Sequence, residues 1–180
     1  MTTLEDLEKR LAALEDIQAI TQLKYRYFRL LDHMQWDELR ECFTDDVETH
    51  YESGHYRFEG IDELMRFLSE SLNGLTQGGR FALHLGHHPE IELLDAHSAR
   101  WRWTLHAPVL DRGAGRVGNH DSFYEDEYRK TEGGWRISRI GYTTYTQSSW
   151  AEPGLELTVG DEADSRAVNA AARASGSLEG

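Results

Sequence analysis

The sequence is poor in cysteine, proline and positive charge, and each shortage excludes a class of protein. Cys42 is the only cysteine among 180 residues, so no disulfide can form within the chain and no cysteine cluster can hold a metal. A reducing compartment fits this composition. Only three prolines, together with 39% hydrophobic and 11% aromatic residues, describe a globular chain that is neither collagen-like nor disordered.

Acidic residues outnumber basic ones: 32 Asp and Glu stand against 19 Lys and Arg, and the formal net charge is −13. Nucleic acids and anionic membranes are bound mainly through Lys and Arg, so neither is an expected partner. No run of about 18 apolar residues is present to span a membrane. The start, MTTLEDLEKR, is acidic and lacks the apolar core of a secretion signal. We expect a cytoplasmic protein.

A chain of 180 residues has room for one ordinary domain. We place that domain at 1–150, with 1–15 as an N-terminal helical extension. Beyond Trp150 the aromatic residues cease, and six acids stand against two arginines in a stretch rich in Ala, Ser and Gly. This composition predicts a flexible acidic tail over 151–180.

Leucines at steps of three and four open the chain and predict an amphipathic helix whose stripe is core or subunit interface: Leu4, Leu7, Leu11 and Leu14. The apolar pattern runs on to Met34, so the helix either continues or restarts near Asp16 as an N-cap. A short second helix is expected to end before Thr44, and a third runs from Gly60 to a C-cap signal at Asn73-Gly74.

Strand patterns occupy 47–51, 56–58 and, after Gly79, four long segments reaching residue 148. The order of helices, short hairpin, helix and meander predicts an α+β fold with a mostly antiparallel mixed sheet. We expect that sheet to curve into a cone around the long N-terminal helix and two further helices, enclosing a pocket.

Strand alternation decides which side chains share a face. His84 shares its face with the small residues Ala82 and Gly86, and His106 shares its face with Arg102. His106 would look into the same space as His84 if its face is the inner one. The alternation does not decide which face is inner.

Four segments resemble the SnoaL-like branch of the nuclear transport factor 2-like superfamily: LKYRYFRLLDHMQWDEL, ETHYESG, HLGHHPEI and FYEDEYRKTEGGWRI. The resemblance covers roughly residues 4 to 148 and is strongest to the bile-acid 7α-dehydratases, with scytalone dehydratases and a dehydrochlorinase more distant. It implies an α+β cone with a pocket between the sheet and the first helix, no cofactor, and a homo-oligomer, either dimer or trimer.

Carried over by position, the resemblance implies that His84 is a catalytic base oriented by Asp32. It places active-site tyrosines at Tyr27 and Tyr51 and a polar, substrate-binding residue at Asn119. Three further residues complete the candidate substrate-binding set: Trp36, Tyr142 and Arg102.

Two positions depart from the family pattern. Thr144 stands where an arginine is expected, and Ala107 stands where an aspartate is expected. His106 lies beside Ala107 and is the candidate to replace the missing acid. These departures leave the general acid and the substrate class open.

The paired acid and imidazole have a chemical logic of their own. A neutral imidazole with an ordinary pKa of ~6.5 can remove a proton near neutral pH. A carboxylate on its other nitrogen fixes the tautomer and stabilises the imidazolium that forms. The sequence therefore predicts a lyase of the dehydratase type acting on a small, largely apolar carbonyl compound, such as a steroid or polyketide-like ring.

Other interpretations stay open. The same pair would serve an isomerase, a cyclase or a dehydrohalogenase, and the fold also hosts non-catalytic assembly subunits such as the small subunit of ring-hydroxylating oxygenases.

Three nearby histidines suggest a metal site: His84, His87 and His88. Pro89 and the lack of a carboxylate at a recognisable spacing argue against one. We expect His87 and His88 to form a strand bulge or a pocket rim.

Overall fold

The computed structural model describes residues 2–152, so the predicted tail lies outside the described residues apart from its first two. In chain order the elements are α1 (Leu4–Asp32), α2 (Trp36–Arg40), β1 (Phe43–Tyr51), α3 (Ile61–Gln77), β2 (Arg80–Ala82), β3 (Leu85–Leu93), β4 (Ser98–Asp111), β5 (Arg116–Thr131) and β6 (Gly134–Ala151). Among these residues, no helix is both long enough and apolar enough to cross a membrane.

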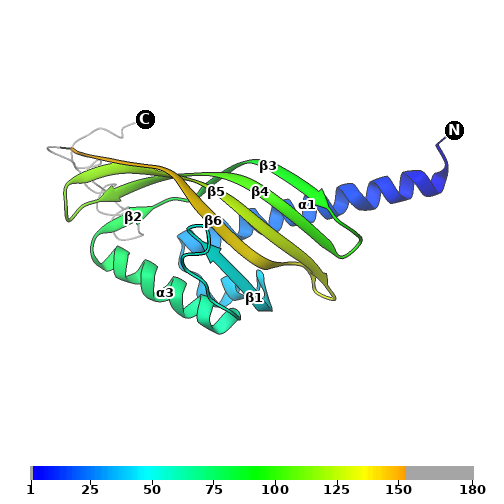
Figure 1. The fold of residues 1–180 in the computed structure, drawn as a ribbon, viewed down its shortest axis with the longest axis horizontal. Helices are drawn as coiled ribbons and strands as arrows, with labels where there is room; N and C mark the ends of the chain where they lie inside the picture. Colours follow the sequence, from blue (N-terminus) through cyan, green and yellow to red (C-terminus); the bar gives the residue numbers. More distant parts are fainter. Residues whose placement is uncertain (1, 153–180) are drawn as a thin grey trace, which may run out of the picture.

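The sheet follows the order β1-β6-β5-β4, and β2 and β3 both pair with β4 along its free edge. β1 runs parallel to β6, whereas all the other pairs are antiparallel. The sheet curls into a half-barrel, with α1 and α3 on its concave side (Figure 1). The predicted α+β class with a curved, mostly antiparallel mixed sheet is confirmed.

α1 is one continuous helix of 29 residues, so the alternative of a restart near Asp16 is wrong. The helix begins at a capping box, in which Thr3 and Asp6 satisfy each other's backbone N–H groups. Asp16 instead accepts hydrogen bonds from the Trp135 indole and the Lys130 ammonium at 2.8 and 2.6 Å. It thus ties the middle of the helix to the β5–β6 hairpin.

Three local expectations differ from the structure. Residues 56–58 form no strand, and among them only Tyr56 makes an isolated bridge, with Tyr51. α3 passes through Gly74 and ends at Gln77, with Gly78 as its C-cap and Gly79 following at a φ of +80°. The chain after Gly79 forms β2 and β3 separated by a break, rather than one long strand, although both keep the same register along β4. In the break, the backbone N–H of His84 donates to the Asp32 carboxylate.

The core lies between α1 and the concave face of the sheet. Trp101 and Trp103 on β4 stack with ring centroids 4.6 Å apart and are 2% and 1% exposed. Lys24 of α1 and Asp126 of β5 form an ion pair at 2.7 Å within this core, and neither side chain is exposed to solvent. The inner face of β4 is therefore the tryptophan face, which determines where every other β4 side chain points.

Candidate active site

Asp32 and His84 meet at the edge of the sheet. Asp32 is the last residue of α1, and His84 lies in the break between β2 and β3. The ring Nδ1 of His84 is 2.6 Å from Oδ1 of Asp32, and the backbone N–H of His84 donates to the same carboxylate, at 3.1 Å to Oδ2. The side chain of Asp32 is 9% exposed and that of His84 is 18% exposed. Because a carboxylate accepts, Nδ1 carries a proton, and in the neutral ring Nε2 then has the lone pair.

A glycine beside the break makes this geometry possible. Phe28 of α1 lies parallel to the His84 ring, with an angle of 11° between the planes and 6.4 Å between the centroids. A Cβ added to Gly86 would come within 2.3 Å of the Phe28 ring. Gly86, two residues after His84, therefore leaves room for the Phe28 ring beside it.

The dyad opens into a pocket of about 340 Å³ between the sheet, the end of α1 and the end of α3. This volume suits a small organic molecule. Its lining is mainly apolar, with a few polar groups: Leu31, Asp32, Met34, Leu72, Leu75, Thr76, Arg80, Phe81, Ala82, His84, Leu105, Ala107, Val109, His120, Ser122, Tyr124 and Tyr142.

A second histidine in the pocket, His120, was not among the predicted site residues. Its Nε2 is 2.8 Å from the hydroxyl of Thr144, and that hydroxyl donates to Glu52 at 2.5 Å. Because the Thr144 proton goes to Glu52, the neutral ring of His120 donates through Nε2 and keeps its lone pair on Nδ1. Burial lowers the pKa of His120, Glu52 opposes that shift and His84 adds to it.

The four predicted tyrosine and tryptophan residues occupy different depths. Tyr142 lines the pocket. Tyr27 and Tyr51 are 1% and 3% exposed and stand behind the lining, with the Tyr51 ring centroid 4.9 Å from that of Tyr142. Burial raises the pKa of both phenols well above the ordinary value, so they stay protonated. Trp36 packs against the core from α2 and is not part of the pocket lining.

His106 and Arg102 do not share the space of His84. Because Trp101, Trp103 and Leu105 point into the core, the alternate residues of β4 point outward. His106 is half-exposed there and contacts Asp121 at 2.6 Å, directly across the β4–β5 ladder. The expectation that His106 looks into the pocket is therefore wrong.

Asn119 likewise falls outside the pocket lining. It lies one residue before His120 on β5, and alternation turns the two side chains to opposite faces. Its partner across the ladder is Pro108, whereas Ala107 faces His120. The polar group that β5 contributes to the pocket next to Ser122 is thus His120.

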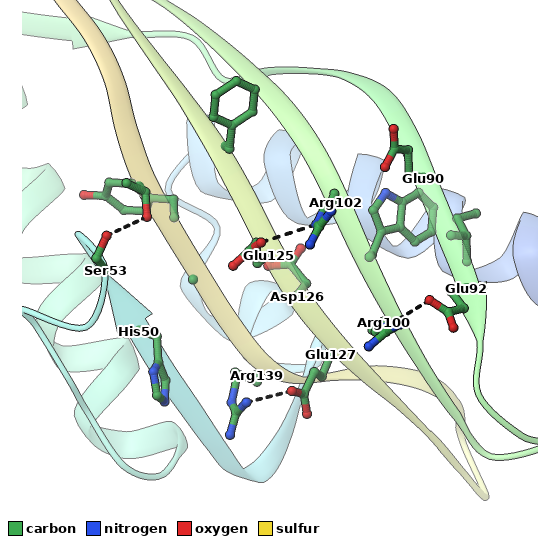
Figure 2. A pocket seen from close by; sticks show the side chains of 16 residues that line it. His50, Ser53, Glu90, Glu92, Arg100, Arg102, Glu125, Asp126, Glu127 and Arg139 are labelled. Atoms are coloured by element: carbon green, nitrogen blue, oxygen red, sulfur yellow. Dashed lines mark hydrogen bonds and ion pairs between the residues drawn. The ribbon is translucent and has the colours of Figure 1, made fainter.

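A larger hollow, of about 670 Å³, lies on the outer face of the sheet, and Arg102 belongs to it. Figure 2 shows the side chains there crossing from strand to strand in ion pairs: Arg100 with Glu92, Arg102 with Glu125, and Arg139 with Glu127. Arg102 is 73% exposed. These charges satisfy one another in solvent, so the smaller, mainly apolar pocket is the candidate reaction site.

Within residues 2–152, no three or more His, Cys, Asp or Glu side chains are grouped so as to hold a metal. His87 and His88 are exposed at an irregularity in the β3–β4 pairing, and His88 has a φ of +51°. The predicted strand bulge at these histidines is confirmed.

Comparison with known proteins agrees with this architecture. The family model described as the SnoaL-like domain matches residues 12–141. A putative scytalone dehydratase from Novosphingobium aromaticivorans is 20% identical with a TM-score of 0.69, covering 81% of this chain and 98% of its own. A hexachlorocyclohexane dehydrochlorinase from Novosphingobium barchaimii is 17% identical with a TM-score of 0.70, covering 84% and 99%.

A nuclear transport factor 2-like protein with a cystatin-like fold, also from N. aromaticivorans, is 23% identical with a TM-score of 0.69, covering 80% of this chain and 91% of its own. At these identities the solved structures establish the fold alone. The family model spans most of the chain and establishes more: the chain belongs to the SnoaL-like family.

Proposed function

We propose that the chain is a cofactor-independent lyase of the dehydratase type, acting on a small, largely apolar carbonyl compound bound in the 340 Å³ pocket. The observation that carries this proposal is the contact between Asp32 and His84 at the pocket wall, with Nδ1 held by the carboxylate at 2.6 Å. Two relatives with the same fold are described as a putative scytalone dehydratase and a dehydrochlorinase, and both of these names denote eliminations.

The reaction begins at Nε2 of His84. This nitrogen takes the proton from the carbon next to the substrate carbonyl, and the electrons of the C–H bond form an enolate. Asp32 stabilises the imidazolium that results. The enolate then expels the β-hydroxyl group, the C–O bond breaks, and the imidazolium returns its proton to the departing oxygen as water.

His120 holds the hydroxyl group in this scheme. Its Nε2 is occupied by Thr144, so Nδ1 of the neutral ring is the nitrogen that can accept a hydrogen bond from the substrate. Thr144 and Glu52 fix that tautomer from behind. Thr144 stands where the family pattern has an arginine. At this position a neutral hydroxyl group therefore replaces a cation.

The test uses a panel of cyclic ketones bearing a β-hydroxyl group, in D₂O, with NMR detection of deuterium uptake next to the carbonyl and of water loss. His84→Gln should lower both rates by on the order of 10²–10⁴-fold while leaving the thermal transition nearly unchanged. Asp32→Asn should lower both as well, because an amide no longer fixes the imidazole tautomer.

His106→Gln is the matched control. It removes a histidine with the same 2.6 Å contact to an aspartate, but on the outer face of the sheet. Unchanged rates in this variant would assign the chemistry to the pocket. Full activity in His84→Gln would refute the proposal.

Dehydrohalogenation is the second candidate, because it starts from the same proton abstraction and one relative is described as a dehydrochlorinase. A matched panel of β-chloro compounds, followed by chloride release, separates the two. Each β-chloro compound is compared with the β-hydroxy compound of the same ring. Faster chloride release than water loss within these pairs would favour the second candidate.

A further inference from the structure

The first three turns of α1 carry apolar side chains that nothing in the described chain covers. Leu4, Leu7, Leu11 and Leu14, which we call the leucine stripe, are 74%, 50%, 57% and 63% exposed. Figure 1 shows these turns projecting past the end of the sheet. Four leucines on one line of a helix are a costly surface to leave in water.

The chain's own sheet cannot cover the leucine stripe, because α1 docks through the opposite side. Each residue advances the helix by about 100°. Asp16, which contacts Lys130 and Trp135, and Ile20, which is fully buried, therefore point roughly opposite to the stripe. Docking one side of the helix onto the sheet turns the leucines outward.

The spacing of the stripe is that of a coiled-coil seam. Steps of three, four and three place Leu4 and Leu11 at a positions and Leu7 and Leu14 at d positions of two successive heptads. Glu5 and Lys9 lie on the outer side of the helix, where they pair with each other at 2.7 Å. The seam is thus apolar and its outer side is charged.

The flanking charges select a partner and an orientation. Arg10 falls at a g position, and Glu15 falls at the e position of the next heptad, which is the pairing that parallel helices make across a seam. Within residues 2–152 both side chains are exposed and neither makes an ion pair. An antiparallel arrangement would instead bring the e-position acids Glu8 and Glu15 toward those of the partner.

We propose that the leucine stripe is a self-association surface, on which α1 of a second copy of this chain packs in parallel. Each seam leucine would meet its own counterpart, and two symmetric contacts would form between Arg10 and Glu15. Two heptads alone are too short to form a stable pair of free helices. Here the helix is already held in place by the docking of its second half onto the sheet.

The oligomeric state of the full chain tests the surface. Sedimentation velocity should find an oligomer for the wild-type chain and a monomer for Leu7→Glu/Leu11→Glu. Lys9→Ala, in the same turns but on the outer side, should behave as wild type. A monomeric wild-type chain, or an oligomer that survives the double substitution, would overturn the proposal. A trimer that the double substitution dissociates supports the same surface.

Charge exchange and crosslinking test the orientation. Arg10→Glu should raise the dissociation constant about tenfold, the effect of losing two surface ion pairs, and Arg10→Glu/Glu15→Arg should restore it. Leu7→Cys should form a disulfide with its own counterpart on oxidation, whereas native Cys42 is buried and stays reduced. Crosslinking only when Leu7→Cys is mixed with Leu11→Cys would show an antiparallel pair and overturn the parallel arrangement.

The surface can be judged separately from the reaction, since the leucine stripe contributes no residue to the pocket. If the dehydratase proposal fails, the proposal for the leucine stripe is unaffected. If self-association fails, the proposal for Asp32 and His84 is unaffected.

Discussion

Gly86 and Phe28 decide how the His84 ring is supported. The ring of Phe28 occupies the space that any side chain at position 86 would need. Phe28 also packs edge-on against Trp103 and Tyr124, with centroids 6.2 and 5.9 Å away. It therefore has little room to retreat without moving core residues.

We expect Gly86→Ala to destabilise the fold by about 1–3 kcal/mol, the usual cost of overpacking a core. It should also slow turnover, because it displaces the Phe28 ring beside His84. Gly74→Ala is the control, because a Cβ there meets nothing within 4 Å. Within a helix that change should stabilise by roughly 0.5–1 kcal/mol. Urea unfolding measures both, and equal stability of Gly86→Ala and wild type would contradict the packing account.

His120 links protonation to stability. Its pKa in the folded chain lies below the ordinary value because it is buried, so the unfolded chain takes up a proton at higher pH than the folded chain does. The stability that this residue contributes is fully present above pH ~6.5, and it is lost as the pH falls from there through the folded-state pKa.

His120→Gln should therefore flatten the fall of the melting temperature between about pH 7 and pH 5 relative to wild type. His106→Gln, which removes a half-exposed outer histidine, tests whether any lost histidine gives the same result. Thermal scans across this range supply the measurement. Parallel curves for wild type and His120→Gln would show that burial of His120 carries no such linkage.

At the scale of elements, Lys24 and Asp126 join α1 to β5 through the core. Burial lowers the pKa of Lys24 and raises that of Asp126, and the 2.7 Å contact between them opposes both shifts. Tyr128 also donates to Asp126 at 3.0 Å. The Lys24 ammonium lies 4.0 Å from the ring centroid of Tyr124, a residue of the pocket wall. The pair thus supports the wall from behind.

Lys24→Met should cost about 3–5 kcal/mol, because it leaves the Asp126 carboxylate buried without its partner. Lys24→Met/Asp126→Leu should cost clearly less than Lys24→Met alone, since no unpaired charge remains in the core. Chemical denaturation of the four chains in this cycle gives the coupling between the two sites. Additive losses would mean that the two groups do not interact.

At the scale of the whole molecule, the class of fold could be predicted because helical and strand periodicities change clearly along the chain. The relation between Asp32 and His84 came from the family resemblance, since 52 residues separate them. The alternation of β4 separated Trp101 from Arg102 correctly but did not say which of them faces inward. Burial of two tryptophans at alternate positions on that strand, Trp101 and Trp103, favours the answer that the structure gives.

His120 was missed for a related reason. Its place in the pocket depends on the β4–β5 register, in which Ala107 opposes His120 and His106 opposes Asp121. That register is set where the hairpin turns at 112–115, and a slip of one residue would exchange inside and outside. The helical pattern of α1 had a similar limit: spacing identified its leucines but could not show that the helix docks through its opposite side.

The residues proposed to carry the chemistry and those that shape the far side of the pocket come from separate parts of the chain. Asp32 and His84 come from the end of α1 and the β2–β3 break, whereas Leu72, Leu75 and Thr76 reach the cavity from the last turns of α3. A few substitutions at the end of α3 could change the shape of the pocket without changing Asp32 or His84. If the proposed mechanism holds, chains that differ only at this helix end would bind different substrates and still share one proton-transfer step.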